Sequence, residues 1–109
     1  MAKKIKDISC KQLKDKMVAG DDFILLDVRE PEEFEICQLE GALLVPYSEF
    51  AEHIDDFDQD KNYIVHCKLG GRSSKACEAL IEKGFKDVTN LSGGIIEWAN
   101  QIDKKLEKY

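Results

Sequence analysis

The chain has 109 residues, 43% of them hydrophobic, and a formal net charge of −6 at pH 7. This length and composition predict one domain over residues 1–109. We expect its core at about 5–102, followed by a polar C-terminal tail that frays. The acidic balance argues against a nucleic-acid partner, because phosphate backbones are bound by clustered lysines and arginines. No segment approaches the length of a membrane span and no apolar signal region follows the basic N-terminus, so we expect a cytoplasmic protein with reduced cysteines.

The N-terminal part of the chain predicts a helix followed by a buried strand. Ser9 and Gln12 have the spacing of a capping box, which predicts a helix that begins after Ser9 and stops at Gly20. The continuous apolar run at 23–26 predicts a central strand of a parallel sheet, buried on both faces.

A polar turn follows this strand. Pro31 suits the first turn of a short helix, on which Arg29 and Glu33 are spaced for an ion pair. We expect Asp27 and Arg29 to fix the loop after the strand. In the alternative, Asp27 helps to orient Arg72 or the loop around Cys67 from the neighbouring strand.

The middle of the chain predicts a short strand at 42–45, closed by a proline, and a helix at 50–54 capped by Ser48. The acidic residues within 55–60 predict a solvated loop, with the docking of a basic partner as the alternative.

Cys67 lies at the centre of the stretch that carries chemistry. The apolar run 63–66 predicts a strand, and an apolar stripe with helical spacing predicts a helix over 72–83. Between them, Gly70 and Gly71 can take the positive φ angles that turn main-chain N–H groups inward. A thiol at such a helix N-terminus has a lowered pKa and is a good nucleophile.

The charges near Cys67 support this interpretation. Residues 61–77 include four cations, among them Lys68 and Arg72, and no acid, although the whole chain is acidic. We therefore expect an ionised sulfur, open to solvent, at the floor of a ring of main-chain amides. A structural cysteine ahead of an ordinary helix is the alternative, and it leaves the two glycines and the cations unexplained.

The remaining titratable candidates are given structural roles. His66 is expected to be buried with a hydrogen-bond partner, since neighbours on a strand face opposite sides; a general base is the alternative. Cys77 falls on an apolar helical stripe and Cys10 at a helix start, so both are expected to be inert. Cys37 is the one candidate for a resolving thiol. Without a C-x-x-C pair, we expect no metal site.

The C-terminal part predicts a strand at 88–91 and a helix at 95–102. Strands that alternate with helices indicate an α/β sandwich with a mainly parallel sheet. In such sheets ligands bind at the carboxyl ends of strands, which is where Cys67 would lie.

Four motifs in chain order resemble those of single-domain rhodanese-like sulfurtransferases. They are D-V-R-x-x-x-E-[FY] at 27–34, G-A-x-x-[IV]-P at 41–46, C-x-x-G-x-R at 67–72 and L-x-G-G-x-x-x-W at 91–98. The chain departs from the family where Gln38 and Glu40 replace a histidine and a proline, and we expect an effect on local rigidity or partner preference there.

The resemblance implies a three-layer sandwich around a five-stranded sheet. It also implies an enzyme of the thiosulfate:cyanide sulfurtransferase type, which moves sulfur through a persulfide on Cys67. The residues that would cradle the substrate are Lys68, Leu69, Gly70, Gly71 and Arg72, with Asp27, Arg29 and Ser73 in support. No cofactor is implied. The expected partners are a small anionic sulfur donor such as thiosulfate and a persulfide-donor or sulfur-carrier protein.

Two other functions compete with this one. Phosphatases with a related fold separate their cysteine and arginine by five residues, whereas four separate Cys67 from Arg72, so the loop suits a sulfur atom better than a phosphate. The second alternative is a rhodanese-like module that binds or regulates without catalysis.

Overall fold

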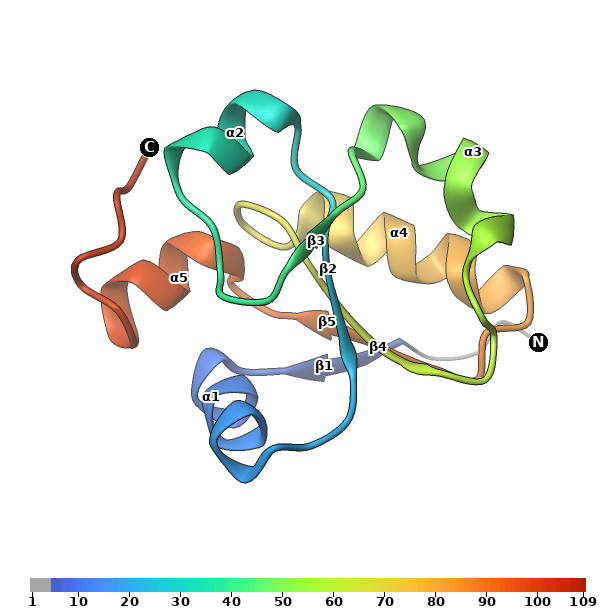
Figure 1. Ribbon diagram of the computed structural model, residues 1–109, viewed down its shortest axis with the longest axis horizontal. Helices are drawn as coiled ribbons and strands as arrows, with labels where there is room; N and C mark the ends of the chain where they lie inside the picture. Colours follow the sequence, from blue (N-terminus) through green and yellow to red (C-terminus); the bar gives the residue numbers. More distant parts are fainter. Residues whose placement is uncertain (1–4) are drawn as a thin grey trace.

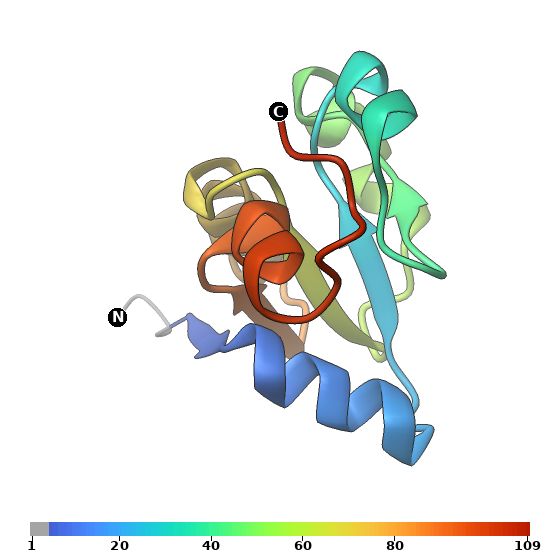
Figure 2. The same ribbon diagram turned by 90° about the vertical axis from the view of Figure 1, so that its left-hand side faces the viewer.

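The computed structural model describes residues 5–109, and the basic residues Lys3 and Lys4 lie outside the described part. Helices cover both faces of a five-stranded sheet (Figures 1 and 2). The strands are β1 (Lys6–Ile8), β2 (Ile24–Asp27), β3 (Leu43–Leu44), β4 (Asn62–His66) and β5 (Asp87–Leu91). The helices are α1 (Cys10–Ala19), α2 (Pro31–Ile36), α3 (Phe50–His53), α4 (Gly71–Glu82) and α5 (Gly94–Gln101), with 3-10 turns η1 (Tyr47–Glu49) and η2 (Ile54–Asp56). The predicted three-layer α/β sandwich is confirmed.

The sheet has the strand order β1-β5-β4-β2-β3, and every neighbouring pair is parallel. β4 is therefore the central strand, with β5 on one side and β2 on the other. Since the strands are parallel, their carboxyl ends meet at one edge of the sheet. Cys67 directly follows β4 and so lies at the middle of that edge.

The two central strands send alternate side chains into two cores. Leu26 and Val65 pack in the cluster that includes residues of α3 and α4. Leu25 and Ile64 pack in the cluster that includes residues of α1 and α5, the helices that lie along one face in Figure 2. This alternation follows from the two-residue period of a strand, and it explains why both strands are continuous apolar runs in the sequence.

The predicted start of α1 is confirmed. The Ser9 hydroxyl accepts a hydrogen bond from the Gln12 N–H (3.1 Å), and the Gln12 side chain accepts one from the Ser9 N–H (2.8 Å). Both halves of the capping box are therefore present, and α1 ends as predicted ahead of Gly20.

Three local features differ from the sequence prediction. The sequence pattern does not single out β1, because two of its three residues are the exposed Lys6 and Asp7. Ser48 does not cap α3: its hydroxyl and its N–H both donate to the Glu30 carboxylate (2.7 and 3.1 Å), which ties η1 to the start of α2. The C-terminal tail is not frayed, since Leu106 and Tyr109 pack against the core beside α1 and α5.

Over residues 5–109, no helix has both the length and the apolar character needed to cross a membrane.

Candidate active site

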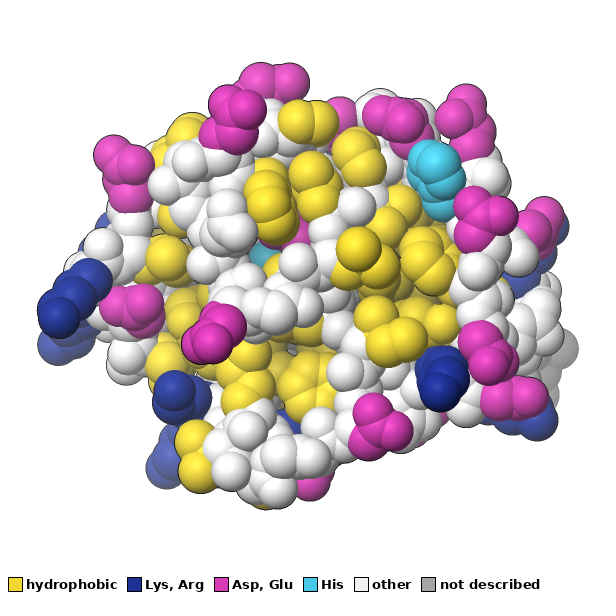
Figure 3. All heavy atoms as spheres, in the orientation of Figure 1, with side chains coloured by type: hydrophobic (Ala, Val, Ile, Leu, Met, Phe, Trp, Pro, Cys, Tyr) yellow, Lys and Arg dark blue, Asp and Glu magenta, His cyan; other side chains and the backbone are white. Residues whose placement is uncertain are grey.

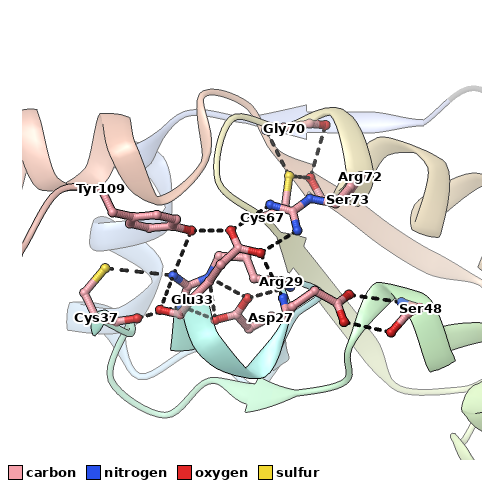
Figure 4. Close-up of polar contacts among 11 residues, drawn as sticks. Asp27, Arg29, Glu33, Cys37, Ser48, Cys67, Gly70, Arg72, Ser73 and Tyr109 are labelled. Carbon is pink, nitrogen blue, oxygen red and sulfur yellow. Dashed lines mark hydrogen bonds and ion pairs between the residues drawn. The ribbon is translucent and has the colours of Figure 1, made fainter. Parts of the chain in front are cut away.

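The residues 67–70 form a tight loop between β4 and α4, named the Cys67 loop below (Figure 4). Gly70 has a φ of 111°, in the region that side chains rarely adopt, and its N–H donates to Cys67 Sγ at 3.1 Å. Gly71, which was predicted to share this conformation, is instead the first residue of α4 and has no positive φ. One glycine is therefore enough to turn the chain around the sulfur.

The N-terminus of α5 holds the Cys67 loop from outside. The Cys67 carbonyl accepts a hydrogen bond from the Ile95 N–H (2.9 Å), and the Lys68 carbonyl accepts one from the Ile96 N–H (3.2 Å). Gly94 allows this close approach, because a Cβ at that position would overlap the Lys68 carbonyl oxygen. With two carbonyls tied to α5, the loop amides are free to face the sulfur.

Hydrogen bonds to Cys67 Sγ outweigh the effect of its burial. Burial raises the pKa of Cys67, but the Ser73 hydroxyl, 3.4 Å from Sγ, and the main-chain amides of Ser73, Gly70 and Leu69 together bring the pKa below its ordinary value. The single proton of the Ser73 hydroxyl is shared between Cys67 Sγ and Asn90 Oδ1, which lies 2.5 Å from the Ser73 oxygen, so the main-chain amides are the constant donors to the sulfur. The arrangement therefore favours the thiolate, which is the nucleophilic form.

The other cysteines differ from Cys67. Burial is the main cause that raises the pKa of Cys77 to about 12 and that of Cys10 to about 11, and both side chains are fully buried, which agrees with an inert role. Cys37 is also buried, and its sulfur lies 3.9 Å from Arg29 Nη1. No hydrogen bond joins Cys37 to Cys67 within residues 5–109, so a role as resolving thiol stays a prediction.

The expectation that the Cys67 sulfur is open to solvent is wrong. Cys67 is only 1% exposed, whereas Leu69 at the tip of the same loop is 66% exposed. The sulfur does lie among main-chain amides, but a donor has to pass the side chains around the loop to reach it.

Arg72 is braced by an acid from another part of the chain. Its Nη1 and Nη2 donate to the two carboxylate oxygens of Glu33 at 2.6 and 2.9 Å, and Figure 4 shows its guanidinium turned toward Glu33. This bond is the main cause that lowers the pKa of Glu33 to about 2. The predicted pair of Arg29 with the Glu33 side chain is wrong, since the only Glu33 atom to which Arg29 donates is the main-chain carbonyl oxygen (3.2 Å).

Asp27 and Arg29 form a buried ion pair that fixes the loop after β2. Both side chains are 0% exposed, and Arg29 Nη2 lies 2.6 Å from Asp27 Oδ2. Arg29 Nη2 also donates to the Cys37 carbonyl at 2.7 Å, so the pair closes the chain around α2. This is the expected structural role. The alternative, in which Asp27 orients Arg72, is not found, because Arg72 is bound to Glu33.

His66 is buried as predicted, but without the predicted hydrogen bond. Neither ring nitrogen has a hydrogen-bond partner within the described residues, and Asp27 Oδ2 lies 3.7 Å from Nε2. Burial, aided by the charge of Arg29, lowers the pKa of His66 from 6.5 to about 4, although Asp27 opposes the shift. His66 is therefore neutral at pH 7.

Acid is expected to destabilise the protein through His66. Its folded-state pKa of about 4 lies below the ordinary 6.5, so the unfolded chain takes up the proton first as the pH falls. The stabilisation present above pH 6.5 is then lost toward pH 4, by about 2 kcal/mol between pH 7.5 and pH 5. Urea unfolding at several pH values measures it. His66→Gln should remove this pH dependence, and a variant of the half-exposed His53 should keep it; equal curves for wild type and His66→Gln would contradict the assignment.

Sequence reasoning missed two side chains of the site. Asn90 at the end of β5 positions the Ser73 hydroxyl, and Tyr109 in the tail contacts Glu33, Arg29 and Lys68. Neither lies within an active-site motif. The only available signal was for Asn90, a polar residue at the carboxyl end of a strand.

Known proteins resemble this chain over most of its length. Residues 9–101 match the family model of the Rhodanese-like domain. The chain is 37% identical to YtwF of Bacillus subtilis over 93% of this chain and 97% of that protein. It is 30% identical to the protein named "Sulfurtransferase" of Allochromatium vinosum, over 87% of this chain and 89% of that protein.

A longer relative and a solved structure extend the comparison. The chain is 36% identical to "Probable adenylyltransferase/sulfurtransferase MoeZ" of Mycobacterium tuberculosis over 94% of its length, but it spans only 26% of MoeZ. The crystal structure of a rhodanese-like domain protein from Staphylococcus aureus superposes with a TM-score of 0.83 at 30% identity, covering 96% of this chain and 99% of that one.

Proposed function

The chain belongs to the rhodanese-like domain family, and on this basis we propose that it is a sulfurtransferase that carries a sulfane sulfur as a persulfide on Cys67. One observation carries the proposal: the Cys67 sulfur accepts the Gly70 N–H at 3.1 Å directly ahead of α4, and its pKa is lowered although it is buried. A buried structural thiol has the opposite shift, as Cys10 and Cys77 do.

The proposed reaction has two displacements at sulfur. The Cys67 thiolate attacks the outer sulfur of thiosulfate; a new S–S bond forms, the S–S bond of thiosulfate breaks, and sulfite leaves with the electron pair. A second nucleophile, such as cyanide or a thiolate, then attacks the terminal sulfur of the persulfide, and the Cys67 thiolate leaves. The division into two steps predicts ping-pong kinetics.

The Cys67 loop would stabilise the intermediate through main-chain groups. The terminal sulfur of a persulfide is negatively charged at neutral pH, and the amides of Leu69, Gly70 and Gly71 together with the N-terminus of α4 provide fixed positive dipoles. Lys68 would attract the anionic donor. Arg72 supports the loop through Glu33, and Asp27, Arg29 and Ser73 support its geometry.

A protein that delivers or accepts sulfur is the second expected partner. The large apolar side chains with more than a third of their surface exposed include Leu69 (66%) and Leu43 (50%). Figure 3 shows apolar side chains gathered over β3 and α3, with acidic ones along the edge. Exposed apolar side chains on β3 and at the tip of the Cys67 loop suit a persulfide-donor or sulfur-carrier protein, and the combined name of MoeZ supports such a partner.

A phosphatase is the less favoured function. Cysteine phosphatases need the loop arginine to bind phosphate oxygens, preferably with both nitrogens. Here the Nη1 and Nη2 fork of Arg72 is bound to Glu33, and the loop has four residues between Cys67 and Arg72 where those phosphatases have five. Turnover of an aryl phosphate would overturn this argument.

The test is the mass of the intact protein after incubation with thiosulfate or glutathione persulfide. We expect a gain of one sulfur atom that is absent in Cys67→Ser, retained in the matched control Cys77→Ser, and lost again when cyanide is added. If no donor adds sulfur to the wild-type protein, the chain is a binding module and the proposed function is wrong.

A further inference from the structure

The C-terminal segment crosses the gap between the Cys67 loop and α2. After α5 the chain turns at Asp103, whose N–H donates to the Trp98 carbonyl (3.0 Å), and Leu106 anchors it against the core. Figure 2 shows the segment rising from the end of α5 past β2 to the level of α2. Tyr109 is thereby brought to the side of the Cys67 loop (Figure 4).

Tyr109 joins three parts of the site. Its hydroxyl accepts a hydrogen bond from Arg29 Nη1 (3.1 Å) and donates one to Glu33 Oε2 (2.7 Å). Its ring has Lys68 Nζ 4.5 Å from the centroid and the Arg29 guanidinium 5.7 Å from it. One side chain thus contacts the Cys67 loop, the loop after β2 and α2.

These contacts restrict movement around the buried sulfur. Glu33, which accepts from the Tyr109 hydroxyl, also holds Arg72, and the Tyr109 ring engages the ammonium of Lys68. Tyr109 therefore restrains two cations near the Cys67 loop, Lys68 directly and Arg72 through Glu33. Because the Tyr109 ring lies against Lys68, the residue that follows the buried Cys67, moving Tyr109 away from the Cys67 loop breaks both hydrogen bonds and both cation–π contacts.

We propose that Tyr109 is a specificity-determining residue at the mouth of the Cys67 site, which admits small anions and slows the access of bulky or protein-bound sulfur donors. The inference rests on the proposed function only for its consequence in sulfur transfer. Access to the Cys67 thiol can be measured without any transfer of sulfur.

The access experiment compares two alkylating reagents on the full chain. Iodoacetamide is the small reagent and a maleimide on a polyethylene glycol chain is the bulky one. Rates at Cys67 are followed by mass across a pH series, so that the limiting rate of the thiolate is separated from its pKa. The variants are Tyr109→Ala, which removes the ring, and Tyr109→Phe, which keeps the ring but loses the hydroxyl. Tyr47→Ala, in η1, is the matched control.

We expect Tyr109→Ala to raise the limiting rate of the bulky reagent by about tenfold, equivalent to about 1.4 kcal/mol. The rate of iodoacetamide should change by less than about twofold, because a small reagent does not need the segment to move. Tyr109→Phe should lie between wild type and Tyr109→Ala. An equal bulky rate in wild type and Tyr109→Ala, or an equal rise in Tyr47→Ala, overturns the proposal.

The sulfur-transfer experiment compares thiosulfate with glutathione persulfide. In Tyr109→Ala we expect kcat/KM for the larger donor to rise relative to that for thiosulfate by about the same factor of ten. An unchanged ratio overturns the role in donor choice. If the wild type takes sulfur from neither donor, the proposed function fails, and the alkylation rates still decide whether Tyr109 controls access.

Discussion

Replacing Gly94 with alanine is expected to lower the free energy of unfolding by about 3 kcal/mol or more, which is at the severe end for a single substitution. Two causes add. Gly94 has a φ of 64°, a conformation that costs an L residue roughly 1–2 kcal/mol. A Cβ there would also overlap the Lys68 carbonyl oxygen and lie 2.7 Å from that of Cys67. These neighbours are backbone atoms, so they cannot rotate away, and urea unfolding measures the cost.

The same substitution should also remove the reactivity of Cys67. If α5 moves back to make room, the hydrogen bonds from Ile95 and Ile96 to the loop carbonyls are lost, and the loop amides no longer hold their direction. The pKa of Cys67, measured from the pH dependence of its alkylation, should then rise toward its ordinary value, and sulfur labelling should fall.

Two other glycines provide controls for Gly94→Ala. Gly41 has a φ of 80°, but a Cβ added there would meet no atom within 4 Å, so Gly41→Ala should show the backbone strain alone, about 1–2 kcal/mol. Gly71 has neither a positive φ nor a close neighbour among the described residues, so Gly71→Ala should be neutral or stabilise by up to about 1 kcal/mol. If Gly94→Ala costs no more than Gly41→Ala, the contact of α5 with the Cys67 loop is not tight.

Asp27→Asn is expected to lower the free energy of unfolding by about 3–5 kcal/mol, the usual cost of removing one partner from a buried ion pair. The Arg29 side chain is 0% exposed, and Asp27 accepts hydrogen bonds from its Nε (2.9 Å) and Nη2 (2.6 Å). Arg29 cannot neutralise itself in response, because a guanidinium keeps its proton at any ordinary pH. Its charge would remain buried without a counter-charge. Urea unfolding at pH 7 checks the value.

The surface pair of Lys6 and Asp87 is the matched control. Its side chains are 60% and 42% exposed, so Asp87→Asn should cost less than about 1 kcal/mol. A double variant of Asp27→Asn with Arg29→Met should be more stable than Asp27→Asn alone, since it removes the uncompensated charge. Equal losses in Asp27→Asn and Asp87→Asn would mean that the buried pair does not fix the loop after β2.

Features that depend on neighbouring residues could be predicted from the sequence. The capping box of α1 involves residues three positions apart, and the position of Cys67 follows from an apolar run, a glycine and a helical stripe that adjoin one another. The strands β2 and β4 are buried on both faces and carry the continuous apolar pattern that this environment requires. Local pattern was therefore enough to place Cys67 at the carboxyl edge of the sheet.

Features that depend on distant partners could not be predicted in this way. Glu33 is four residues from Arg29, which suggested a helical pair, yet it binds Arg72, which is brought near only by the fold. The strand β1 exists because it pairs with β5, and its own residues carry no strand pattern. The burial of Cys67 likewise depends on the surrounding side chains, which the pattern of the loop does not reveal.

The parallel sheet has a consequence for the chain during its synthesis. Within residues 5–109, no neighbouring strands are joined by a hairpin, and β1 reaches its partner only when Lys6 pairs with Thr89. The hydrogen bond between Ser73 and Asn90 and the one from the Ile95 N–H to the Cys67 carbonyl can form only after Asn90 and Ile95 have been synthesised. A nascent chain on the ribosome therefore carries Cys67 as an ordinary peptide thiol until the residues through Ile96 have been made and folded.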